Sequence, residues 1–154
     1  MLFDPKFQHC VDRPEARLGR ARTPTPELMS AVIAETCGPL SARGEAATLH
    51  IRQLIESGAW TDAALALVQL ELPQWRFRRI VYEDGEWHCS LSREPQLPPD
   101  LDDVADGRHE ALPLAMLIAF LQARRDAAVG AVDAAAKPRV GSPGGDPVCC
   151  DNFA

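Results

Sequence analysis

Hydrophobic and polar positions alternate along one stretch of this chain, from Trp75 to Leu91, whereas elsewhere hydrophobic residues recur at helical spacing. The stretch carries β-branched and aromatic residues on both sides of Asp84-Gly85. An Asp-Gly pair between two such runs is typical of a two-residue hairpin turn. The pattern therefore predicts one antiparallel β-hairpin, with strands at about 75–83 and 86–93.

A two-residue turn fixes which side chains of the hairpin face one another. It places Tyr82 opposite Trp87, Ile80 opposite Cys89 and Arg78 opposite Leu91. Large apolar groups then fall on both faces: Ile80, Tyr82, Trp87, Cys89 and Leu91 on one, and Trp75, Phe77 and Val81 on the other, beside Arg79, His88 and Ser90. In a sheet with one solvent-exposed face, hydrophobic and polar residues alternate more regularly than this along each strand. We therefore expect helices on one face and a partner, or the N-terminal arm, on part of the other.

Apolar residues recur every three or four positions in the segments before the hairpin, which predicts three helices. The first follows a Thr25 cap and stops at Gly38, the second opens at Ser41 and ends at Gly58, and the third follows a Thr61 cap and stops at Pro73. The short connection between the second and third makes them an antiparallel helical hairpin.

A proline-broken acidic connection from Glu94 leads to a last helix, predicted from near His109 to Val129. Its residues 114–121 are apolar on every side. A helix of that kind must be enclosed all round. In a domain this small, a second subunit is one source of the enclosing surface.

These elements predict a single α+β domain that is mainly helical, with one antiparallel hairpin packed on helices. We divide the chain into an irregular N-terminal arm (1–23), a compact domain (24–130) and a flexible Gly/Pro-rich tail (131–154). The tail contains Cys149 and Cys150, the most unusual pair among five cysteines. An odd number of cysteines without framework spacing favours free thiols.

Composition narrows the classes of function. The chain of 154 residues is 46% hydrophobic and 25% charged, which is ordinary for a globular protein. Its net charge of −6 argues against a general nucleic-acid binder. Lys6 and Lys137 are the only lysines among 16 basic residues, a usage typical of GC-rich bacterial genomes. Charge and proline near Met1 and the short apolar run at 114–121 predict a cytoplasmic protein with no membrane partner.

No motif for catalysis or for a cofactor accompanies this architecture, so we expect a non-enzymatic protein without a cofactor. His88 and Cys89 are adjacent on a strand and point to opposite faces, so they cannot pair as base and nucleophile. Carboxylates at 102–110 lie near His109, but their spacing matches no zinc or EF-hand pattern.

The favoured hypothesis is an interaction or assembly module that acts as a homo-oligomer, most simply a homodimer. Its expected interface anchors are Trp75, Phe77, Arg79, Trp87 and Phe120. Two alternatives remain: thiol or metal binding through Cys149 and Cys150, and single-stranded nucleic-acid binding through the aromatic and cationic strand from Trp75 to Arg79.

Overall fold

The computed structural model describes residues 13–37 and 44–136. Over these ranges the chain forms five α-helices, one 3-10 turn and a three-stranded antiparallel sheet of order β1-β2-β3. In chain order the elements are α1 (Pro14–Arg20), α2 (Pro26–Cys37), α3 (Glu45–Glu56), α4 (Trp60–Glu71), β1 (Arg76–Glu83), β2 (Glu86–Ser92), η3 (Pro99–Leu101), β3 (Val104–His109) and α5 (Leu112–Ala136).

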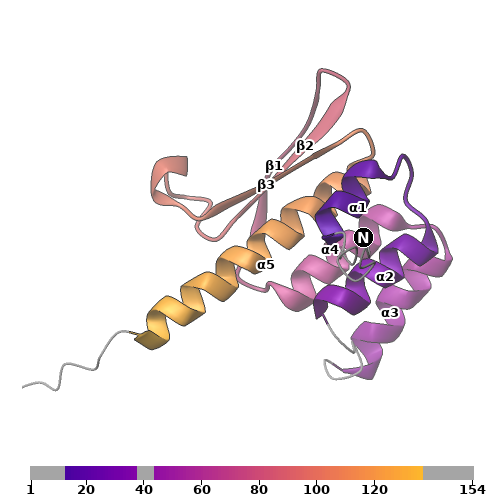
Figure 1. Cartoon of the computed structure of the whole chain (residues 1–154), viewed down its shortest axis with the longest axis horizontal. Helices are drawn as coiled ribbons and strands as arrows, with labels where there is room; N and C mark the ends of the chain where they lie inside the picture. Colours follow the sequence, from indigo (N-terminus) through magenta and orange to yellow (C-terminus); the bar gives the residue numbers. More distant parts are fainter. Residues whose placement is uncertain (1–12, 38–43, 137–154) are drawn as a thin grey trace, which may run out of the picture.

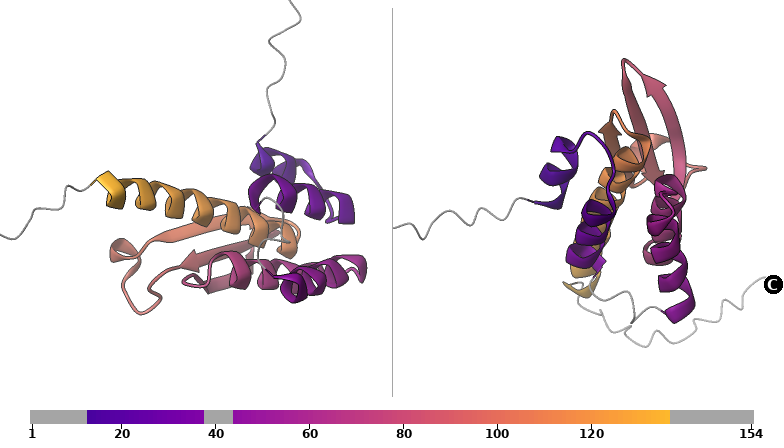
Figure 2. Two further views of the ribbon diagram at one scale, coloured as in Figure 1. Left: turned by 90° about the horizontal axis from the view of Figure 1, so that it is seen from below. Right: turned by 90° about the vertical axis from the view of Figure 1, so that its right-hand side faces the viewer.

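Helix α5 is the central element of the fold. It packs against β3 and β2 on the sheet side and against α4 and α1 among the helices. Figure 2 shows α1 and α2 on one side of α5, and α3 and α4 on the other. All of 114–121 except Ile118 is buried, and Phe120 is fully enclosed by the chain itself. The apolar helix therefore needs no second subunit to cover this segment.

The β-hairpin forms at the predicted place. Asp84 and Gly85 have φ values of 54° and 86°, as a primed two-residue turn requires. The pairs Tyr82–Trp87 and Ile80–Cys89 are confirmed. A bulge between Phe77 and Arg79 then changes the register, so that Phe77, and not Arg78, lies opposite Leu91. The bulge adds one residue to β1 and brings Phe77 to the face that packs on the helices.

Four features of the predicted architecture were wrong or incomplete. The acidic connection contains a third strand, β3, so the sheet is larger than a hairpin. The N-terminal arm contains α1, whose Leu18 is fully buried. Helix α5 continues past the expected end of the domain to Ala136. Thr25 does cap α2 through the Leu28 N–H, but α4 begins at Trp60, before the expected Thr61 cap.

The inward positions of β3 explain why it was missed. They are Ala105, Gly107 and His109, all buried, which lack the β-branched or aromatic character of a recognisable strand. At Gly107 the strand lies directly on α5: a Cβ there would be 2.2 Å from the Ala115 carbonyl oxygen and 2.5 Å from the Ala119 amide nitrogen. Both neighbours are backbone, so only glycine permits this contact.

Asp102 organises the connection between β2 and β3. Its carboxylate accepts hydrogen bonds from the Ser92 hydroxyl and, at 2.9 Å, from the Glu94 N–H, and it pairs with Arg78 at 3.3 Å. Burial raises the pKa of Asp102, but these hydrogen bonds and the Arg78 charge outweigh it and hold the pKa below the ordinary value of 3.8. The same contacts hold the Arg78 side chain at the bulge of β1.

We predict that Gly107→Ala lowers the free energy of unfolding by about 2 kcal/mol or more, because β3 and α5 must separate to admit the methyl group. Chemical denaturation measures this. Gly130→Ala in α5 is the matched control: among the described residues, no atom beyond its neighbours and its own helix backbone lies within 4 Å of its Cβ position, and alanine favours a helix by about 0.5–1 kcal/mol. Equal stability of the Gly107→Ala protein and the wild type would contradict the described packing.

We also predict a pH dependence of stability from Asp102. Its pKa is lower in the folded chain than the value of about 3.9 in an unfolded one. Its stabilising contribution is therefore complete above about pH 4 and disappears as the pH falls through the folded pKa. In Asp102→Asn, the free energy of unfolding should change less steeply with pH below about 4 than in the wild type. Asp100→Asn, an exposed neighbour, is the control, and identical slopes for the Asp102→Asn protein and the wild type would refute the prediction.

Candidate functional site

Strand β1 is an edge of the sheet and makes its principal contacts with β2, whereas α5 packs on β2 and β3. The turn end of the β1–β2 hairpin extends past the start of α5 (Figures 1 and 2). Within residues 13–37 and 44–136, no strand pairs with the outer edge of β1. We call the outer segment of β1, from Arg79 to Glu83, the free edge.

Two large apolar side chains of the free edge lie in solvent. Ile80 is 41% exposed and Tyr82 is 58% exposed. Both belong to the inner face of the sheet, since they pair with Cys89 and Trp87. The Tyr82 ring lies 5.2 Å from the Trp87 ring, measured between centroids, with the planes tilted by 54°. Trp87 itself is half-buried against the core. The inner face of the hairpin is thus apolar beyond the point where α5 covers it.

The backbone of the free edge also presents unpaired hydrogen-bonding groups. The residues that flank a two-residue turn form a hydrogen-bonded pair, here Glu83 with Glu86, and such pairs alternate along an antiparallel ladder. Val81 therefore bonds to β2, while the N–H and C=O groups of Ile80 and Tyr82 point away from it. An unpaired edge of this kind is a template for another strand.

The outer face of the free edge is charged. Arg79 donates to both carboxylate oxygens of Glu83, at 3.0 and 3.2 Å, across Val81. Both side chains are more than half exposed, so the pair contributes little to stability in water.

The predicted interface residues fall in three different environments. Trp75 and Phe120 are core residues and are not available to a partner. Phe77 and Trp87 pack against the core and remain partly exposed. Arg79 lies on the surface. Ile80, Tyr82 and Glu83 complete the exposed segment. The sequence pattern does not predict these three residues as anchors, because the alternation of hydrophobic and polar residues does not show how far the covering helix extends.

The structure reduces the aromatic surface between Trp75 and Arg79 that nucleic-acid stacking would use to the partly exposed Phe77. Trp75 is buried, Phe77 packs on the core, and Arg78 and Arg79 are paired with Asp102 and Glu83. Cys149 and Cys150, the candidate thiol or metal ligands, lie outside the described residues.

His88 and Cys89 do point to opposite faces of β2: Cys89 is buried under the helices, and His88 is on the outer face beside Ser90. Burial raises the pKa of the Cys89 thiol to about 11. Because the thiolate is the reactive form, Cys89 is suited to packing and not to nucleophilic chemistry.

The outer face of β2 and β3 carries ordinary polar pairs. The Ser90 hydroxyl donates to Asp106 on β3, and His88 lies opposite Arg108. Asp106 is on this face, whereas His109 is buried on the other and accepts the Ala111 N–H at 2.9 Å. No three His, Cys, Asp or Glu side chains of the described residues gather closely enough to hold a metal ion.

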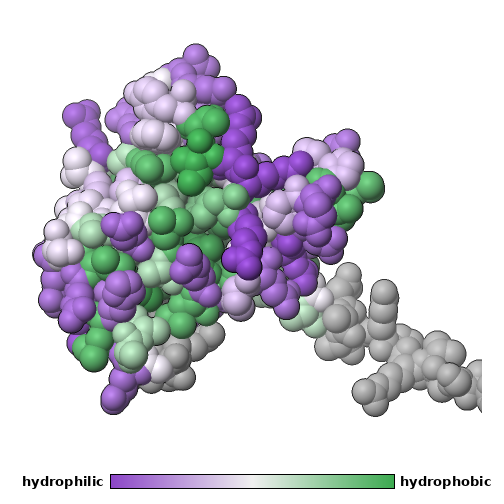
Figure 3. Space-filling view, turned by 180° about the vertical axis from the view of Figure 1, so that it is seen from behind, coloured by the Kyte–Doolittle hydropathy of each residue, from purple (hydrophilic) through white to green (hydrophobic). Residues whose placement is uncertain are grey.

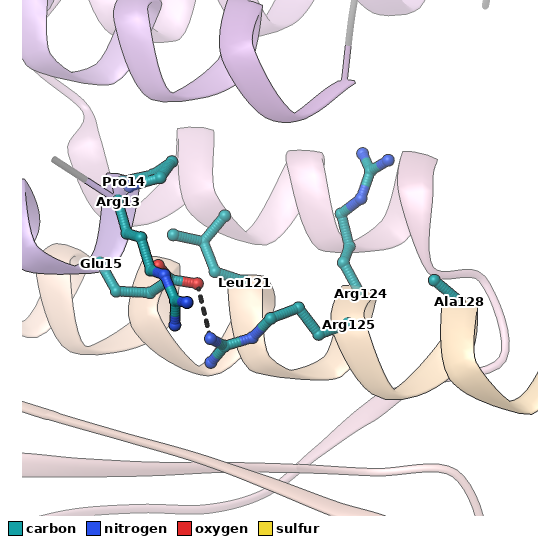
Figure 4. A pocket seen from close by; sticks show the side chains of 7 residues that line it. All are labelled: Arg13, Pro14, Glu15, Leu121, Arg124, Arg125 and Ala128. Carbon is teal, nitrogen blue, oxygen red and sulfur yellow. Dashed lines mark ion pairs between the residues drawn. The ribbon is translucent and has the colours of Figure 1, made fainter. Parts of the chain in front are cut away.

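A groove between α1 and α5 is lined by Arg13, Pro14, Glu15, Leu121, Arg124, Arg125 and Ala128 (Figure 4). Arg125 pairs with Glu15 at 3.2 Å. Arg124 extends away from that pair and reaches the buried Glu71 of α4 at 3.0 Å. Two of the three arginines that line the groove, Arg124 and Arg125, therefore join helices to one another. We interpret the groove as a structural contact between α1, α4 and α5.

Apolar surface also occurs away from the hairpin. Figure 3 shows hydrophobic side chains gathered over the helical part of the face turned away in Figure 1. Leu65 and Leu70 of α4 are partly buried against the core. Val129 and Val132 of α5 are 69% and 71% exposed. They lie toward the C-terminal end of α5, which extends beyond the helical body (Figure 1).

None of the described helices is both long enough and apolar enough to cross a membrane. Comparison with known proteins assigns no family or function to the chain: no protein-family model, no curated protein and no solved structure matches it.

Proposed function

We propose that this protein is a non-enzymatic interaction and assembly module that acts as a homo-oligomer through its β1–β2 hairpin. The observation that carries the proposal is the free edge, where exposed Ile80 and Tyr82 coincide with backbone groups that no other strand of the described residues bonds. Exposed apolar residues are common singly. Their coincidence with an open edge is what distinguishes this surface.

The second candidate surface is the exposed pair Val129 and Val132 on α5. A helix satisfies its own backbone groups, so this surface offers apolar contact alone. The hairpin offers apolar contact together with directional hydrogen bonds, and for that reason it is the surface we favour.

Thiol or metal binding through Cys149 and Cys150 remains a separate proposal, because those residues lie outside the described part of the chain. Metal analysis of the reduced full-length protein, compared with a Cys149→Ser, Cys150→Ser variant, tests it. Stoichiometric metal that the variant loses would support it, and equal metal content in both would refute it.

We expect the full-length protein to form dimers in sedimentation velocity at concentrations of about 1–200 µM, the range suited to a small, reversible interface. Replacing Ile80 and Tyr82 together by threonine, which keeps β-propensity, should raise the dissociation constant at least tenfold. Circular dichroism should show an unchanged fold, because both side chains are exposed.

The matched control replaces Val129 and Val132 by serine, which removes two apolar groups from α5 that are more exposed than Ile80 and Tyr82. This variant should dimerise like the wild type. A wild-type protein that stays monomeric at about 200 µM would overturn the proposed function. Loss of the dimer in the α5 variant alone would move the interface to that helix.

A further inference from the structure

Building on the proposed function, we infer that the partner of the free edge is a second copy of this chain, paired antiparallel through β1 about a two-fold axis at Val81. The pairing would place Ile80 of each copy opposite Tyr82 of the other, and Arg79 opposite Glu83. The two sheets would then form one continuous sheet of six strands.

The bulge limits where β1 can pair. It interrupts the regular strand between Phe77 and Arg79, and the Arg78 side chain is held by Asp102 and by the Leu97 carbonyl oxygen at 3.0 Å. At the other end, Asp84 turns away with a positive φ. Within the described part of the chain, residues 79–83 are therefore the regular segment of β1 whose outer edge pairs with no other strand.

Backbone geometry then selects the axis. Side chains that face each other in an antiparallel pair lie on the same side of the sheet, so the two-fold axis must pass through a residue and not between two residues. An axis at Ile80 would oppose Tyr82 to the bulge, and an axis at Tyr82 would oppose Ile80 to the turn. An axis at Val81 opposes Ile80 to Tyr82 twice, and these are the two residues whose N–H and C=O groups point outward.

The side chains of the free edge are complementary in the same register. On the inner face, each exposed Tyr82 ring meets an exposed Ile80, an aromatic and β-branched pair of the kind that stabilises sheets. On the outer face, Arg79 of each copy meets Glu83 of the other. These residues already pair across Val81 within one chain, so association exchanges or shares that ion pair and leaves no like charges opposed.

Charge reversal in two separate chains tests the register. Arg79→Glu alone brings two acidic residues together at each end of the pairing, and Glu83→Arg alone brings two basic ones together, so each variant should dimerise at least tenfold more weakly than wild type. An equimolar mixture of the two variants should form a heterodimer, because every opposed pair is again of opposite charge. Intrachain effects cannot produce this rescue, since neither chain has a complementary pair of its own.

A disulfide trap provides a second measurement. Cys10, Cys37, Cys149 and Cys150 are replaced by serine, which leaves the buried Cys89. Val81→Cys should then oxidise to a covalent dimer, because the two Cα atoms on the axis would lie about 4.5 Å apart, within disulfide range. Arg79→Cys in the same background is the control and should cross-link poorly, since its partner position is Glu83.

The outcomes separate this inference from the proposed function. Heterodimer rescue together with the Val81→Cys cross-link supports the register. A wild-type dimer without rescue and without the cross-link overturns the register, while the assembly function stands. A wild-type monomer overturns both.

Discussion

The structure depends on one backbone contact, the approach of β3 to α5 at Gly107. Because a Cβ atom would lie within 2.5 Å of two backbone atoms of α5, the strand and the helix meet without an intervening side chain at this point. That contact sets α5 against β3 and β2, where Ala105, Cys89 and Leu91 are buried. With α5 over these two strands, the third strand, β1, is left outside the cover.

The same arrangement explains the unequal character of β1. Its first part is tied to the body of the protein: the bulge turns Phe77 onto the core, and Arg78 reaches the Asp102 carboxylate of the next connection. Its second part extends past the start of α5 and keeps apolar side chains, unpaired backbone groups and a self-complementary charge pair in solvent. A bulge commonly protects an edge from unwanted pairing. Here it limits the regular part of the edge to five residues, which in our proposal favours one register.

The polar groups of the described residues that could take part in chemistry have structural roles. Cys89 is buried with a raised pKa, Ser90 and Asp106 form a surface pair, and the arginines beside the α1–α5 groove largely bind carboxylates of neighbouring helices. In the described part of the chain, Ser90, Asp106, Arg124 and Arg125 each have a structural partner, and Cys89 packs in the core. The free edge differs because its complement is missing from the described fold and is supplied, in our proposal, by its own copy.

The sequence by itself determined the local elements whose signals are short-range. Asp84-Gly85 specified the turn, since both residues adopt a positive φ. The two-residue turn then fixed the Tyr82–Trp87 and Ile80–Cys89 pairs. Thr25 specified the start of α2 through its hydroxyl.

The tertiary structure decided the rest. Strand β3 forms because its small inward residues, Ala105 and Gly107, fit beneath α5. On a propensity scale these residues are weak strand formers. Phe120 and Trp75 lie in the core because the chain encloses its own apolar helix, and Ile80 and Tyr82 lie in solvent because α5 starts too late to cover them. Burial depends on where a distant helix lies, and no local pattern contains that information.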